Sequence, residues 1–306
     1  MSLRTKVRAF TLLELAVVLA ILGVAGAAMG MLLIRQQRFY RGASELLYAR
    51  EGVRDALEVL AGDLRGIAVD DTVRLLADSA IEIYSSVGSS VACQVIDKEV
   101  GLPRAVPSGN TLSAFVAEPD TGDLALFYRA TGDGSSWEPH RIGAFSARVL
   151  AAVCPASSGF SSPEDIASGA QGFQVTLDAP LSADIRPGAP VRFIRRGRYS
   201  LYRASDGSSY LGYRRCNAQG ASSCGAVQPL SGPYRAYSAN PAATGLLLEY
   251  FDDDGHRLTA ASSSLSLARV DVTARSESNQ RLSIEGHTFK PADSATVSIA
   301  IRNRLP

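Results

Sequence analysis

Residues 10–34 read Phe-Thr-Leu-Leu-Glu-Leu-Ala-Val-Val-Leu-Ala-Ile-Leu-Gly-Val-Ala-Gly-Ala-Ala-Met-Gly-Met-Leu-Leu-Ile. From Leu15 to Ile34 this stretch has twenty residues without a charge. A helix of that length spans about 30 Å, which is enough to cross the hydrocarbon core of a bilayer. The sequence therefore predicts a membrane-spanning helix with one carboxylate, Glu14, at its start.

Three interpretations of this segment compete. A secretory signal peptide would use Ala25-Gly26-Ala27 as a cleavage site. Against it, Glu14 stands at the front of the apolar run, and the run continues through Met29–Ile34 into a helical pattern. The second interpretation is a plain signal anchor, and the third is a processed leader.

The third interpretation depends on residues 8–15, Arg-Ala-Phe-Thr-Leu-Leu-Glu-Leu, which follow a short basic leader that contains Arg4 and Lys6. This octapeptide resembles the prepilin processing site of type IV pilins and type II secretion pseudopilins. The resemblance implies that prepilin peptidase removes residues 1–9, that Phe10 is then N-methylated, and that Glu14 becomes the fifth mature residue. The family usually has Gly where this chain has Ala9, so slower processing is expected.

The chemistry of Glu14 supports an assembly role. A carboxylate in a membrane helix costs about 2.5–3.5 kcal/mol on insertion scales, so it is expected to have a functional partner. Cleavage would free an α-amine on Phe10, with a reference pKa of about 7.7–8.0. We expect Glu14 to pair with this amine of a neighbouring subunit and to set the axial register of a filament.

Beyond the apolar stretch, residues 35–68 form an amphipathic pattern with a helical period. The apolar positions are Leu46, Val53, Leu57, Leu60, Leu64 and Ile67. One helix from Thr11 to Ile67 would be roughly 80–85 Å long. The alternative is two helices with a break near Gly42.

Charge does not decide the orientation of the membrane helix. Three basic residues precede the span and three follow it, so the positive-inside count is a tie. The family resemblance and the cysteines favour a single-pass protein of the inner membrane, with its N-terminus in the cytoplasm and its globular domain in the periplasm. The same resemblance implies later incorporation into a pilus or pseudopilus.

Four cysteines allow three disulfide pairings. The seven-residue gap between Cys216 and Cys224 suits a small disulfide loop, which leaves Cys93 with Cys154. Four unrelated buried thiols are the alternative. A zinc site is not expected, because the chain has no Cys-x-x-Cys and its three histidines are scattered.

Residues 69–306 alternate short apolar runs with Gly, Ser, Pro and Asp, which is typical of β-structure. The predicted fold class is α+β, with the long helix packed on an antiparallel sheet that has β-rich insertions. Predicted strands are 80–85, 111–117, 124–128, 147–153, 172–177, 190–194, 199–204, 210–215, 245–251, 266–274 and 295–301. Long loops are predicted from Cys154 to Gly169 and from Gln219 to Pro241.

Several local sequences resemble the minor pilin and pseudopilin subgroup often called PilW or GspJ. These are Leu57–Arg65, Val191–Arg203, Leu248–Gly255 with Leu265–Thr273, and Val297–Asn303. The resemblance covers about a third of the globular domain. It implies a large minor subunit rather than a major pilin.

Candidate chemistry in the globular domain is sparse. No phosphate-binding loop, Gly-x-Ser-x-Gly or His-Glu-x-x-His motif occurs, so an enzyme is not expected and no cofactor is predicted. Asp252, Asp253 and Asp254 with Gly255 would be a calcium site on one interpretation. A hairpin turn is the other.

A basic stretch extends from Arg192 to Arg215 with only Asp206 opposing it, and tyrosines are interleaved. Its arginines are Arg192, Arg195, Arg196, Arg198, Arg203, Arg214 and Arg215. Such a pattern suits contact with DNA, docking to another minor subunit, or simply a hairpin with one solvated face.

The net charge of +1 gives no global sign of a nucleic-acid binder. The predicted function is a minor pilin or pseudopilin that helps to initiate or cap a filament of a type IV pilus or type II secretion system. Two alternatives stay open. One is a tip module that contacts a surface or DNA, and the other is a signal-anchored domain without a filament role.

Overall fold

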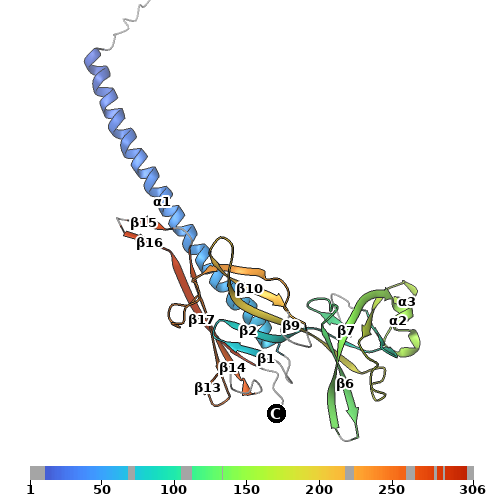
Figure 1. Cartoon of the computed structure of the whole chain (residues 1–306). Helices are drawn as coiled ribbons and strands as arrows, with labels where there is room; N and C mark the ends of the chain where they lie inside the picture. The colour runs from blue at the N-terminus through green and yellow to red at the C-terminus, as the bar shows by residue number, and fades with distance from the viewer. Residues whose placement is uncertain are drawn as a thin grey trace, which may run out of the picture.

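The computed structural model describes residues 11–67, 73–104, 112–132, 134–217, 224–259, 266–278, 281–284 and 287–301. The fold is α+β: one long N-terminal helix packs against a large antiparallel sheet, and a second β-rich lobe lies beside the first (Figure 1). This architecture confirms the predicted fold class.

Helix α1 runs without interruption from Leu12 to Arg65. Its 54 residues correspond to about 80 Å. Thr11 caps its N-terminus, and Gly66 caps its C-terminus by donating its N–H to the carbonyl oxygens of Asp63 and Leu64. The single predicted helix is confirmed, and the predicted alternative with a break at Gly42 is wrong.

The first lobe covers the second half of α1 with antiparallel strands. Its strands are β1 Val73–Ala77, β2 Ala80–Val91, β9 Pro190–Arg203, β10 Ser209–Arg215, β11 Gln228–Tyr234, β12 Leu246–Phe251, β13 Arg257–Leu258, β14 Arg269–Glu277 and β17 Ala292–Ala300. Hairpin β15 Leu282–Ile284 with β16 His287–Phe289 lies near the helix (Figure 1). Leu60 and Leu64 are fully buried in this core, against Val270 and Val272 of β14.

The second lobe has its own apolar core, which contains Phe127, Phe193 and Val175. Its elements are β3 Gln94–Ile96, β4 Glu99–Leu102, β5 Ala114–Phe115, β6 Leu124–Thr131, β7 Gly134–Val149, α2 Leu150–Val153, a 3-10 turn Ala156–Ser158, α3 Pro163–Ala167 and β8 Gln171–Leu177. The predicted β-rich insertion is therefore a compact lobe.

Strands β2 and β9 join the two lobes. Strand β2 pairs with residues 190–200 of β9, from Ala80 opposite Ser200 to Val91 opposite Pro190, with a register shift between Ser86 and Gly88. Residues 191–194 of β9 also pair with β6 of the second lobe, whereas residues 197–203 pair with β10 of the first. One pair of strands thus contributes to both cores.

Three strand predictions need correction. The segments 190–194 and 199–204 form one strand, β9, because Arg195–Arg198 continue the ladder instead of turning. The predicted strand 147–153 ends in helix α2. Most of β7 and all of β11 were missed, since Pro139 in β7 and two prolines in β11 resemble loop sequence. The short strands β1, β3, β4, β13, β15 and β16 were not predicted either.

Of the predicted strand 111–117, only Ala114–Phe115 is extended, and Thr111 lies outside the described residues. The predicted loop 154–169 contains a 3-10 turn and α3.

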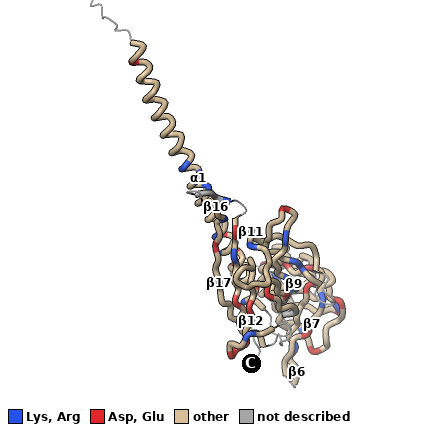
Figure 2. Tube along the Cα trace, turned by 60° about the vertical axis from the view of Figure 1, so that its left-hand side comes forward, with Lys and Arg blue, Asp and Glu red and all other residues tan. Residues whose placement is uncertain are grey.

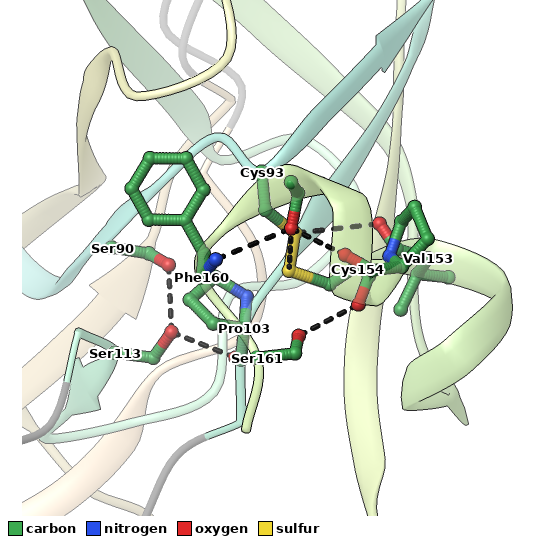
Figure 3. The surroundings of a disulfide bond; sticks show 10 residues. Ser90, Cys93, Pro103, Ser113, Val153, Cys154, Phe160 and Ser161 are labelled. Carbon is green, nitrogen blue, oxygen red and sulfur yellow. Dashed lines mark hydrogen bonds between the residues drawn. A yellow bond between two sulfur atoms is a disulfide. The ribbon is translucent and has the colours of Figure 1, made fainter. Parts of the chain in front are cut away.

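Both predicted disulfides are present: Cys93–Cys154 and Cys216–Cys224. The first ties the segment after β2 to the end of α2, and both of its cysteines are buried (Figure 3). Ser161 donates a 2.6 Å hydrogen bond to the Cys154 carbonyl, and the neighbouring Ser90–Ser113 pair is 2.7 Å apart. This disulfide is therefore surrounded by hydrogen-bonded serines and by buried apolar side chains of the second lobe.

Candidate functional site

The N-terminal half of α1 projects from the globular lobes (Figure 1). Its large apolar side chains are exposed, for example Leu12 at 87% and Val24 at 73%. The helix is long and apolar enough to cross a membrane, and none of its most apolar window is buried in the protein. An apolar surface of this extent marks contact with lipid or with another protein.

Glu14 lies in the first turn of this helix and forms a capping box with Thr11. The Glu14 N–H donates to Thr11 Oγ1 at 3.2 Å, and the Thr11 N–H donates to Glu14 Oε2 at 3.1 Å. Such reciprocal bonds satisfy N–H groups that a helix start leaves open. Among the described residues no cation pairs with Glu14, so its charge is available to a partner.

The predicted processing site, Ala9 and Phe10, lies outside the described residues. Of the predicted processing and assembly residues, the structure therefore describes only Glu14, in the first turn of α1.

A cationic and aromatic segment ends the apolar stretch. It contains Arg35, Arg38 and Arg41, with Phe39 and Tyr40 each 70% exposed. Figure 2 shows the change from the tan, uncharged part of α1 to this charged part. Aromatic and basic residues are enriched where membrane helices leave the hydrocarbon. This segment thus marks the end of the uncharged stretch of α1 that is nearer to the globular lobes.

The basic stretch is largely paired with carboxylates that are distant in sequence. Arg195 Nη2 is 2.7 Å from Asp123 Oδ2, and Arg215 bridges Asp120 and Asp123. Asp123 is only 2% exposed. The hydrogen bonds to Asp123 raise the pKa of Arg195, and the hydrogen bond from Arg215 lowers the pKa of Asp120, so these groups stay charged.

A second cluster of ion pairs joins Glu82 of β2 to two arginines of the basic stretch. Glu82 accepts from Arg196 Nε at 2.6 Å and from Arg198 Nη2 at 2.6 Å. Arg192 stacks on Trp137 with 4.6 Å between the guanidinium carbon and the ring centroid.

Much of the charge on which the predicted DNA contact depended is therefore offset by Glu82, Asp120 and Asp123. The sequence could not show this, because these acids lie about 70–116 residues away. Contact with DNA stays a prediction.

The acidic turn lies in the hairpin between β12 and β13, as predicted. Gly255 has a φ of +82°, which favours glycine, and Asp252 Oδ1 accepts from the His256 N–H at 2.7 Å. Ligand atoms of Asp252, Asp254 and His256 lie within 4.8 Å of one another. The sequence interpretation missed His256. Because calcium prefers oxygen ligands, an imidazole in this set does not strengthen the calcium prediction.

One further polar cluster was not predicted. His140 Nε2 lies 2.8 Å from Glu138 Oε1, and Ser182 Oγ donates to Glu138 Oε2 at 2.5 Å. The serine hydroxyl bonds to the carboxylate and not to the imidazole, so the set lacks the nucleophile–base contact of a hydrolase. Its evident role is to tie β7 to the segment after β8.

Comparison with known proteins supports the N-terminal assignment. Residues 4–30 match the family described as the prokaryotic N-terminal methylation motif. No curated protein and no solved structure matches the chain. The motif supports a type IV prepilin-like protein, and together with the apolar helix it is consistent with membrane association and processing by prepilin peptidase.

Proposed function

We propose that this chain is a filament subunit, cleaved between Ala9 and Phe10, methylated on Phe10 and assembled through α1. The observation that carries the proposal is the exposed apolar half of α1 with a carboxylate in its first turn that has no cationic partner among the described residues. The methylation motif covers the same residues. Inner-membrane insertion, with the lobes in the periplasm, would precede assembly.

Within this class we propose a minor pilin or pseudopilin that helps to initiate or cap the filament. The second lobe supports this finer role, because it adds a unit with its own apolar core, and its described residues lie away from the projecting half of α1 (Figure 1). Two disulfides support exposure to an oxidising compartment. The proposed role is structural rather than enzymatic.

The central test replaces Glu14 in cells that make the full chain. We expect Glu14→Ala to insert into the membrane as the wild type does but to be lost from filaments, because the α-amine of a neighbour then has no anion to pair with. Membrane and sheared-filament fractions are compared by immunoblot. Glu118→Ala, which removes an exposed carboxylate from the second lobe, is the matched control.

Mass spectrometry of the mature N-terminus completes the test. A methylated Phe10 is expected. A mature chain that begins at Ala28, or normal incorporation of Glu14→Ala, would contradict the proposal.

A further inference from the structure

The globular half of α1 has two differently charged flanks, one on each side of its buried face. The acidic flank is a cleft of about 490 Å³ between the helix and β11. Its acidic residues are Glu45, Glu51 and Asp55. The basic flank is a groove of about 580 Å³ between the helix and β17. Its basic residues are Arg50, Arg54 and Arg65.

Most of these charges lack an internal partner. Glu51, Asp55, Arg54 and Arg65 are exposed and take part in no hydrogen bond or ion pair of their side chains within the described part of the chain. Glu45 accepts a hydrogen bond from Ser278. The acidic flank is lined by no lysine or arginine among the described residues.

The basic flank also contains two carboxylates. Arg50 Nε lies 3.6 Å from Asp293, and Glu58 lies at the rim. The flanks thus carry three negative charges on one side and one net positive charge on the other. Exposed ion pairs are individually weak, but opposite patches select a partner and its register.

Both flanks also offer apolar surface. The partly exposed Leu57 and Val297 line the basic flank, and β17 pairs only with β14 among the described strands. Tyr48, 67% exposed, and Leu230, 40% exposed, line the acidic flank. A neighbouring helix would therefore bury apolar area as well as pair charges.

We propose that the acidic flank of one copy receives the basic flank of a second copy, with the two α1 helices parallel. This inference rests on the proposed function, since two copies anchored in one membrane by the same end must be parallel. The contact is heterologous: each copy uses a different flank, so it repeats along a filament instead of closing a dimer.

The charges select a register. Arg54 is nine residues from Glu45 and Arg65 is ten residues from Asp55, so one stagger of about 14 Å satisfies both pairs. A smaller stagger of five residues would pair Arg50 with Glu45. It would also bring Glu58 beside Asp55, and that like-charge contact disfavours it.

Cysteine cross-linking in cells that make the full chain tests the register. Tyr48 and Glu58 are exposed, ten residues apart, and lie on opposite flanks. Within one helix their sulfurs would be too distant to bond. We expect the double variant Tyr48→Cys/Glu58→Cys to form a ladder of covalent dimers, trimers and larger species on oxidation. The single variants, and a Tyr48→Cys/Arg148→Cys control, should not form it.

Charge exchange tests the chemistry of the contact. In the double-cysteine background, Asp55→Arg or Arg65→Glu alone should lower the cross-linking yield by roughly threefold or more. The two together should restore it. Dimers from a single-cysteine variant, a ladder indifferent to both reversals, or no ladder would overturn the inference.

Mass spectrometry of the N-terminus in the same samples separates the two hypotheses. Correctly processed chains without a ladder contradict only the flank contact. Unprocessed chains contradict the proposed function.

Discussion

Glu82 is a fully buried acidic side chain of the first lobe, at 1% exposed. It forms ion pairs with Arg196, which is 3% exposed, and with Arg198, which is partly exposed. Arg196 also donates to the Asn217 carbonyl at 2.7 Å. Two buried or partly buried cations of β9 therefore share this one carboxylate of β2.

We expect Glu82→Gln to lower the free energy of unfolding by about 3–5 kcal/mol, since it removes the buried carboxylate that is ion-paired with Arg196 and Arg198. Urea unfolding of the detergent-solubilised full chain measures this. The matched control is Glu249→Gln, which removes the exposed pair with Arg257 and should cost less than about 1 kcal/mol. Equal losses in the two variants would contradict the assigned role.

Tyr234 contributes a pH dependence at the contact between β11 and α1. Its hydroxyl donates to the Gly52 carbonyl at 2.5 Å, and burial raises its pKa to about 12. The unfolded pKa is about 10, so the folded state holds the proton more tightly. The corresponding stability is complete below pH 10 and is lost as the pH rises toward 12.

This shift predicts a loss of about 2–3 kcal/mol between pH 10 and pH 12. Tyr234→Phe should show a smaller loss over that interval, although buried Tyr250 shifts in the same direction. Unfolding curves at several alkaline pH values make the comparison. Parallel pH profiles for the wild type and the variant would show that Tyr234 does not titrate in this way.

At the scale of elements, helix α1 shows where the sequence pattern was sufficient. Its first half contains the uncharged stretch from Leu15 to Ile34, its second half has an apolar stripe from Val53 to Leu64 with a helical period, and no proline interrupts either part. Burial of that stripe against β14 and β17 offsets the cost of the glycines within the helix. Strand β9 shows the opposite case, because its four-residue centre, Arg195–Arg198, has no apolar alternation and is held as strand by pairing with β2 and, at residues 197–198, with β10.

Two glycines with different surroundings test the elements. A Cβ on Gly62 of α1 would meet no atom within 4 Å, so Gly62→Ala should stabilise the chain by about 0.5–1 kcal/mol. A Cβ on Gly101 of β4 would lie 1.6 Å from the Val153 carbonyl oxygen, so Gly101→Ala should destabilise it. Thermal unfolding of the full chain should move in opposite directions, and shifts of the same sign would contradict this account.

At the scale of the whole molecule, two cores share strands β2 and β9 but differ in their covalent links. Cys93–Cys154 closes a sequence separation of 61 residues within the second lobe, and Cys216–Cys224 closes 8 residues in the first. Longer closed loops restrict the unfolded chain more strongly. The second lobe therefore depends more on its disulfide than the first.

Replacing Cys93 and Cys154 together by alanine should destabilise the second lobe by about 4 kcal/mol. The Cys216→Ala/Cys224→Ala control should cost about 2–3 kcal/mol. Hydrogen exchange should show faster exchange in β6, β7 and β8 for the first variant, with β12 and β14 little changed. Uniform acceleration across both lobes would argue against two cores.

Some of the candidate sites could be predicted from the sequence, and others could not. Glu14 was identifiable because the rule it breaks, an acid within an apolar helix, is local. The cysteine pairs followed from spacing and from the small number of partners. The arginine stretch was misleading, because its partners Glu82, Asp120 and Asp123 come from β2 and from the turn before β6. The strands with prolines were missed because tertiary pairing outweighed their local preference.

By itself, the sequence determined the long helix, its uncharged half, the early carboxylate and the β-rich remainder, because these depend on period, length and composition along the chain. Only the tertiary structure decided that the strands form two cores joined by β2 and β9, that most of the basic stretch is internally paired, and that α1 has an acidic and a basic flank. Those properties depend on which distant segments meet, and burial and ion pairing across the fold decide that.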